Sequence, residues 1–259
     1  MTTDTGGGGV MTGARRMAGV PAVVACALVA TLVQVVVTPP AQAVVHETKV
    51  TIGTSVQGRP IVAYHRWSPG WTRKVLVIGN MHGDEKAGLR VIARLRTRRL
   101  PDNLNLWLIP TINPDGNAAD RRTNARRVDL NRNFPRRWVY AGRGTSKYSG
   151  PRAASEPETR ALVRFVKERR PRTTISFHQP LFGVDSYRAK SMTLVRALSS
   201  ATGLPVRYFD CHGGCHGTFT DWHNDRTPGR AVTVEFGRTA SSARLDRVAT
   251  AVLRVGSTS

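Results

Sequence analysis

The chain has 259 residues, and its 39 Lys and Arg outnumber its 17 Asp and Glu, which gives a formal net charge of +22. Hydrophobic residues make up 40% of the chain and charged residues 22%, a globular composition that excludes a disordered basic tail. The charge alone is typical of a nucleic-acid binder, and the length suits one large α/β domain or two small ones.

The first predicted element is a signal peptide over residues 1–43. Arg15 and Arg16 form its positive start, residues 20–37 are an almost unbroken apolar run, and Ala41-Gln42-Ala43 matches a cleavage signature. We therefore expect cleavage near Ala43 and a secreted or cell-wall-associated protein. A retained transmembrane helix is the alternative, because the run is near the lower bound of about 18 residues for a span.

Export changes what the charge implies. Outside the cell, a basic surface meets anionic wall polymers, membrane lipids or carboxylate-bearing substrates rather than genomic DNA. Cleavage leaves residues 44–259, which contain no linker. We expect this part to be one catalytic domain and a monomer.

Beyond residue 43, predicted strands alternate with predicted helices. The strands cover 48–52, 59–66, 74–78, 104–110, 173–177 and 231–236, and the helices cover 87–98, 155–170, 191–202 and 241–255. We expect Ser155 to cap the second helix, with Glu158 completing a capping box. The alternation predicts an α/β fold, in which a mixed, mostly parallel twisted sheet carries helices on both faces.

Three residues at predicted strand ends form a candidate metal site. His82 and Glu85 lie three apart just after the 74–78 strand, and His178 follows the 173–177 strand. Sites in open α/β sheets gather at these carboxyl ends. Two histidines and one carboxylate with an open fourth position make a catalytic zinc site, although a His-x-x-Glu spacing alone also arises by chance.

Two further features carry polar chemistry. Residues 122–135 are a dense polar cluster that would be costly to bury without ligands or ion pairs. Glu235 stands among Val and Phe on the 231–236 strand. It is therefore either solvent-facing or a positioned acid/base.

Together these residues resemble a known family, the zinc carboxypeptidases of the carboxypeptidase A superfamily. The motif residues stand in that family's order and approximate spacing: His82, Glu85, Arg122, Asn131, Arg132, His178, Asp221, Trp222 and Glu235. Residues 52–61 resemble its opening strand pair, and residues 155–159 resemble the start of its central helix. The segment 128–135 is most similar to short bacterial members that include murein peptide amidases. The resemblance covers nearly all of 48–255.

The resemblance implies catalytic roles. His82, Glu85 and His178 hold one Zn²⁺ per chain, which lowers the pKa of a bound water toward ~7. Glu235 is the general base and then the proton donor to the leaving amine. Arg122 stabilises the developing oxyanion.

It also implies substrate contacts. Asn131 and Arg132 grip the terminal carboxylate of a peptide, which the arginine fork suits, and this grip implies an exopeptidase. We expect Asp129 to orient this clamp. Thr220 occupies the base of the side-chain pocket. A small polar residue there argues against a bulky apolar terminal residue, and it lacks the acid that would select Lys or Arg.

The sequence departs from the family at two places. Arg127 stands where a glycine normally precedes Val128, and a positive φ there would strain an arginine by about 1 kcal/mol. The mobile tyrosine of animal digestive members has no counterpart in register, Tyr208 included.

Cys211 and Cys215 are the two cysteines that remain after cleavage. In an exported chain we expect them to form a disulfide, and the two intervening glycines would let so short a loop close. The alternative is a second metal site that adds His212 and His216, whose spacing is not that of a usual zinc knuckle.

We therefore expect a secreted zinc metallocarboxypeptidase that hydrolyses a C-terminal peptide bond in peptidoglycan stem peptides, such as the bond between D-glutamate and diaminopimelate. Its partners would be muropeptides with a free C-terminal carboxylate and anionic wall polymers, not nucleic acid. The alternatives are a general secreted peptide carboxypeptidase, a deacylase of N-acyl amino acids, and a catalytically inactive basic wall-binding protein.

Overall fold

The computed structural model describes residues 7–11, 13, 19, 45–211 and 214–259. The chain divides into two units, residues 1–41 and 42–259. Most of the predicted signal peptide, including Arg15, Arg16 and the apolar run from 20, lies outside the described residues, so its cleavage stays a prediction. In the described part of the chain, every helix is too short or too polar to cross a membrane.

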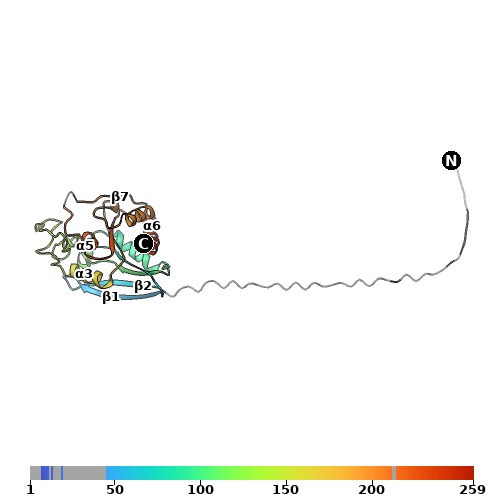
Figure 1. Cartoon of the computed structure of the whole chain (residues 1–259), viewed down its shortest axis with the longest axis horizontal. Coiled ribbons are helices and arrows are strands. Elements are labelled where there is room, and N and C mark those ends of the chain that lie inside the picture. Colours follow the sequence, from blue (N-terminus) through green and yellow to red (C-terminus); the bar gives the residue numbers. More distant parts are fainter. Residues whose placement is uncertain (1–6, 12, 14–18, 20–44, 212–213) are drawn as a thin grey trace. The chain divides into compact units, whose positions relative to one another are not determined.

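The second unit is built on one mixed sheet (Figure 1). Its strands, in spatial order, are β1 (His46–Thr54), β2 (Pro60–Trp67), β4 (Leu104–Ile109), β3 (Arg73–Ile78), β5 (Thr173–His178), β8 (Arg230–Glu235), β6 (Gly183–Asp185) and β7 (Val206–Arg207). The central run β4-β3-β5-β8 is parallel, while β1, β2 and β6 join by antiparallel pairing. The predicted mixed, mostly parallel sheet is confirmed.

Helices cover both faces of the sheet, as predicted. One apolar core joins alternate residues of β3, such as Val75 and Val77, to α1 (Ala87–Thr97), α4 (Met192–Thr202) and α6 (Ser242–Thr258). The other core joins the intervening residues Leu76 and Ile78 to α3 (Pro157–Arg169) and α5 (Phe219–Arg226). Because side chains alternate along a strand, each central strand is buried from both sides, which explains the continuous apolar runs.

Two short helices, α2 (Pro114–Ala118) and the 3-10 helix η1 (Leu130–Arg132), lie in the long connection between β4 and α3. This connection contains the polar cluster at residues 122–135. Its backbone is held by its own side chains. For example, the Asn113 carboxamide accepts a hydrogen bond from the Gly116 N–H. The connection therefore carries fixed rather than loose polar groups to the end of the sheet.

The prediction that Ser155 caps α3 is wrong. The helix begins at Pro157, and its N-cap residue Glu156 makes no side-chain capping bond. The Ser155 hydroxyl donates to the Glu156 carboxylate, and the Glu158 carboxylate accepts from the Val56 backbone N–H. The Ser155 hydroxyl also accepts a hydrogen bond from the Asn133 side chain. Contacts with other segments therefore hold both side chains, and the local capping pattern does not decide where the helix starts.

Candidate metal centre and active site

The three predicted metal ligands converge at the carboxyl edge of the sheet. His82 and Glu85 lie in the turn between β3 and α1, and His178 is the last residue of β5. All three are buried, and their ligand atoms lie within 4.8 Å of one another. His82 Nδ1 is 2.7 Å from Glu85 Oε1 and 3.2 Å from His178 Nδ1, and His178 Nδ1 is 3.1 Å from Glu85 Oε2.

This donor set fits zinc. Two ligand atoms at about 2.0–2.1 Å from a tetrahedral Zn²⁺ are separated by about 3.3 Å, close to the distances observed. The second ring nitrogens are also occupied, because His82 Nε2 is 3.0 Å from Asp129 Oδ1 and His178 Nε2 is 3.2 Å from Ser176 Oγ. Such partners fix the ring orientation, so that Nδ1 of each histidine faces the shared centre.

Charge is strongly coupled within this cluster. Burial opposes a positive charge on His82, but the Glu85 and Asp129 carboxylates outweigh it and raise the pKa of His82 to about 9. Burial likewise opposes the charge on Glu85, yet the two histidines hold its pKa well below the usual range. The cluster therefore holds Glu85 as a carboxylate and favours a proton on His82, which a bound metal ion would displace.

Glu235 is the last residue of β8 and pairs in register with His178 on β5. Its side chain is buried, and its Oε2 accepts a hydrogen bond of 3.3 Å from the Leu181 backbone N–H. Burial is the main cause that raises the pKa of Glu235, with a further contribution from Glu85 and an opposing one from His178. Of the two alternatives left by the sequence, the positioned carboxylate is the one observed.

Arg122 lies between the metal cluster and Asp129. Its Nε and Nη2 donate to Asp129 Oδ2 at 3.1 and 2.9 Å, and its Nη1 is 3.3 Å from Glu85 Oε1. Burial opposes its charge, but Asp129 and Glu85 outweigh this and raise the pKa of Arg122. The guanidinium is thereby held permanently charged at the edge of the metal cluster.

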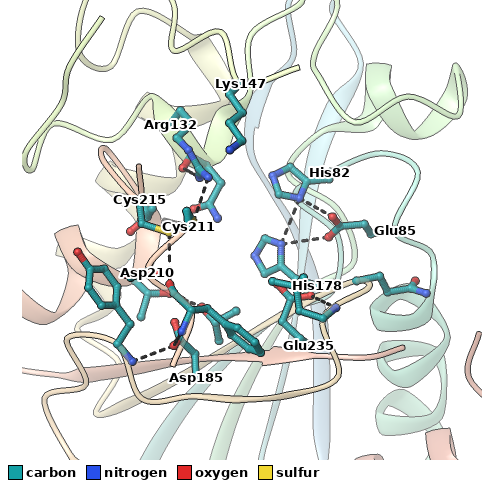
Figure 2. Close-up of a pocket in the computed structure, with 18 of the residues that line it drawn as sticks. His82, Glu85, Arg132, Lys147, His178, Asp185, Asp210, Cys211, Cys215 and Glu235 are labelled. Carbon is teal, nitrogen blue, oxygen red and sulfur yellow. Dashed lines mark hydrogen bonds and ion pairs between the residues drawn. A yellow bond between two sulfur atoms is a disulfide. The ribbon is translucent and has the colours of Figure 1, made fainter. Parts of the chain in front are cut away.

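The predicted carboxylate clamp lies on η1. The Asn131 side chain accepts a hydrogen bond from the Phe219 N–H, which ties η1 to the start of α5. Arg132 donates to the Asn131 carbonyl and to the Cys211 sulfur, while its buried Nε has no hydrogen-bond partner in the described part of the chain. Burial lowers the pKa of Arg132. Figure 2 shows Arg132 on the wall of the pocket opposite His82 and Glu85.

Cys211 and Cys215 are joined by a disulfide, with their Cα atoms 5.1 Å apart, in the wall beside Arg132 (Figure 2). The alternative was a second metal site formed by these cysteines with His212 and His216, and His212 lies outside the described residues. Within the described residues, the His/Cys/Asp/Glu group able to share a metal ion is the one at His82.

The three metal ligands, Glu235, Arg122, the clamp residues and the two cysteines line one pocket of about 500 Å³. Thr220 lines it as predicted, and its hydroxyl is 2.8 Å from that of Thr233. Tyr208 also lines the pocket, and its side chain is largely exposed to solvent. Position 220 carries no acid, but Asp221, the next residue of α5, and Asp185 at the end of β6 also line the pocket.

Two further residues refine the sequence analysis. Arg127 has a φ of 64°, so the backbone at the position where the family carries glycine is indeed left-handed. Asp129 does more than orient the clamp, because its Oδ1 accepts from both His82 and the Asn131 N–H while its Oδ2 accepts from Arg122.

Known proteins resemble this chain both in sequence and in fold. A family model described as zinc carboxypeptidase matches residues 46–180. Murein peptide amidase A of Vibrio campbellii is 32% identical over 192 residues, which cover 69% of this chain and 75% of that protein. Murein peptide amidase A of Escherichia coli K12 is 31% identical over 167 residues, or 60% and 67% of the two chains.

Solved structures of related proteins have the same fold as this chain. Murein-tripeptide amidase MpaA from Escherichia coli O157 superposes with a TM-score of 0.66 at 26% identity, covering 84% of this chain and 95% of that one. Carboxypeptidase A from Helicoverpa armigera has a TM-score of 0.69 at 17% identity, covering 84% and 69%, which supports the fold.

Proposed function

Because the chain belongs to the zinc carboxypeptidase family, we propose that it hydrolyses the C-terminal peptide bond of peptidoglycan stem peptides, such as that between D-glutamate and diaminopimelate. The protein is a metallopeptidase, and the family implies zinc. The observation that carries the proposal is that the metal cluster, a buried carboxylate and a buried arginine line the same pocket. The relatives named as murein peptide amidases supply the substrate class.

His82, Glu85 and His178 would hold one zinc ion, which when bound lowers the pKa of a water molecule toward ~7 and polarises the scissile carbonyl. Glu235 then accepts the proton of the attacking water and passes it to the leaving amine. Its raised pKa suits both steps, because a carboxylate that is too acidic cannot return the proton.

Arg122 is oriented for charge stabilisation. Two of its nitrogens are committed to Asp129, so the remaining Nη1 is aimed at the metal cluster, where the carbonyl oxygen becomes negative. A donor that is already in place needs no reorganisation during the reaction. Loss of one such donor typically lowers kcat by ~10²–10³.

Arg132 and Asn131 would bind the free carboxylate of the terminal residue. A buried guanidinium with an unused Nε–H is costly unless an anion binds it, and a carboxylate can accept two parallel hydrogen bonds from the fork. The depressed pKa of Arg132 records the same burial. This requirement for a free carboxylate would confine cleavage to the end of a peptide.

We also propose that the protein acts outside the cell, after removal of residues 1–43. The support is the signal-peptide pattern, the disulfide and the basic composition. Sequencing of the secreted protein should begin at Val44. An uncut N-terminus on membrane-bound protein would favour the retained helix instead.

The decisive experiment incubates zinc-loaded protein with muropeptides and with ordinary peptides and identifies products by mass. Release of diaminopimelate-containing fragments is the expected result. Release of ordinary terminal residues alone would favour the general peptide carboxypeptidase, and cleavage only of N-acyl amino acids would favour the deacylase. No turnover by zinc-loaded protein would favour the inactive wall-binding protein. Glu235→Gln protein and a chelator serve as negative controls.

A further inference from the structure

A second pocket, of about 630 Å³, shares no lining residue with the active site and is rich in arginine. Its lining comes from residues 126–128, from the segment 143–152 and from the two residues just before α3. We call it the arginine pocket, and its four basic residues, all of them exposed, are Arg126, Arg127, Arg143 and Arg152. Positive charge is thus concentrated in one hollow away from the metal centre.

The acidic residue of this lining, Glu156, does not neutralise the four arginines. Glu156 is buried, and its carboxylate accepts hydrogen bonds from the Asn124 and Ser155 side chains. Of the four guanidinium groups, that of Arg126 approaches this carboxylate, at 3.7 Å. The other three line the pocket without an ion-pair partner in the described part of the chain.

Arg127 stands on a backbone that glycine would adopt more easily. Its φ of 64° is left-handed, a conformation that a side chain disfavours. The backbone N–H of Arg127 donates to the Asn124 carbonyl at 3.0 Å, a bond that glycine would also make. The side chain itself makes no hydrogen bond or ion pair within residues 45–211 and 214–259. The fold therefore bears the strain of this arginine without using its guanidinium, which points to a ligand outside the chain.

The chemistry of this lining suits phosphate. Each guanidinium can donate two parallel hydrogen bonds to a phosphate group, and all the basic residues of the lining are arginine rather than lysine. The oxygens of a phosphate are arranged tetrahedrally, so they can accept from donors that surround a hollow, whereas the two oxygens of a carboxylate lie in one plane. A polymer gains further affinity, because counterions are released at each phosphate that it places against an arginine.

The segment 143–148 borders both pockets. Ser146 and Lys147 line the active-site pocket, and Tyr148 lines the arginine pocket. The Tyr148 carbonyl accepts a hydrogen bond of 2.7 Å from the Asp129 N–H, which fixes this border. A polymer held in the arginine pocket would therefore lie beside the active site.

On the basis of the extracellular function proposed above, we propose that the arginine pocket binds a phosphodiester polymer of the cell wall and holds the enzyme beside its substrate. The polymer is recognised through its repeated phosphate groups. Arg127 and Arg152 are the residues to test, because neither side chain is bonded to another described residue. Their removal therefore takes away charge without breaking a contact within the described fold.

The test measures, by calorimetry at several salt concentrations, the binding of the protein to poly(glycerol phosphate). The double variant Arg127→Gly, Arg152→Gln should bind this polymer about 10-fold more weakly than wild type at low salt, as expected for two exposed ion pairs. The slope of log K against log[salt] should become shallower by about 0.7 for each phosphate contact that is lost. The melting temperature of the variant should not fall, since glycine suits the left-handed backbone.

A matched double variant controls for net charge. Arg196→Gln with Arg254→Gln removes two exposed arginines from α4 and α6, which cover the face of the sheet opposite to α3. This protein should bind poly(glycerol phosphate) as wild type does. An equal loss of affinity in both double variants would mean that the overall charge decides binding, and the assignment to the arginine pocket would be wrong.

Two other polyanions test the chemistry of the ligand. Polyglutamate of equal charge carries carboxylates in place of phosphates, and a single-stranded oligonucleotide carries phosphodiesters of a different polymer. The loss of affinity in the Arg127→Gly, Arg152→Gln protein should be greatest for poly(glycerol phosphate). An equal loss for polyglutamate would contradict recognition of phosphate, and a larger loss for the oligonucleotide would assign the pocket to nucleic acid instead.

Binding and hydrolysis are measured separately, so this inference and the proposed function can fail independently. Neither Arg127 nor Arg152 lines the active-site pocket, so the double variant should cleave soluble muropeptides at the wild-type rate. If no muropeptide is cleaved but the variant loses affinity for the polymer, the proposed function fails and the polymer site stands. If muropeptides are cleaved but the variant binds the polymer as tightly as wild type, the inference fails and the proposed function stands.

Discussion

Asp129 links the metal cluster to the substrate clamp, so replacing it by Asn tests the whole arrangement. Its side chain is fully buried and accepts four hydrogen bonds. Oδ1 accepts from His82 Nε2 at 3.0 Å and the Asn131 N–H at 2.9 Å, and Oδ2 accepts from Arg122 at 3.1 and 2.9 Å. A carboxamide keeps only one of these oxygens, so its NH₂ group must face donors on one side.

The chemistry of the partners decides which side loses its acceptor. Arg122 can only donate, whereas an imidazole nitrogen can accept if the ring changes tautomer. We therefore expect the new oxygen to stay with Arg122, which donates twice, and the NH₂ group to face His82, with loss of the acceptor for the Asn131 N–H. The proton of His82 then moves to Nδ1, the nitrogen that has to bind the metal. Loss of such a partner typically weakens metal affinity 10- to 100-fold, or by about 1.4–2.7 kcal/mol.

Competition with a chromogenic chelator would measure the zinc affinity of Asp129→Asn against wild type. Asp246→Asn, which makes the same substitution at the surface, provides the matched control. Circular dichroism of the metal-free proteins would establish that the variant is folded. A zinc affinity within threefold of wild type in a folded variant would refute the argument that Asp129 sets the tautomer of His82.

Three other predictions concern single residues. Glu235→Gln should keep zinc but lose nearly all hydrolysis. Because burial raises the pKa of Glu235, the kcat/KM of the wild-type protein should begin to fall with decreasing pH above ~4.5, the pKa of a free glutamate. A pH–rate profile would show this fall. Arg132→Lys should raise KM for peptides more than it lowers kcat, since lysine lacks the fork, while peptide amides should be poor substrates of both proteins. Burial lowers the pKa of His223 from 6.5 to about 4. Between these pH values the imidazole is protonated in the unfolded state but not in the folded state. The free energy of unfolding should therefore fall by about 2 kcal/mol between pH 7 and pH 5. Urea denaturation should show a smaller fall for His223→Gln.

The parts of the site on the central strands were predictable. The runs 74–78, 173–177 and 231–236 match β3, β5 and β8 to within one residue at each end. Strands buried on both faces give continuous apolar runs, and parallel neighbours end at the same edge. The chemistry at His178 and Glu235 could therefore be assigned to one place without knowing any contact.

The short and irregular parts were not predictable in the same way. β6 and β7 have three and two residues, too few to show a period, so the sequence pattern does not predict them. Asp185 was missed for this reason. Its neighbours along the chain are ordinary, and only the pairing of β6 with β8 places it on the same side of the sheet as Glu235. Ser155 shows the opposite error, since a good local pattern yielded to other contacts, among them the hydrogen bond that the Ser155 hydroxyl accepts from the distant Asn133 side chain.

The charge that first suggested nucleic acid has a more local meaning inside the pocket. Arg132 and Lys147 lie toward one side of it and Asp185 and Glu235 toward the other (Figure 2). A substrate that itself carries separated opposite charges would be oriented by such a pocket as well as held in it. The net charge of +22 therefore says less about the ligand than the separation of opposite charges across a single pocket.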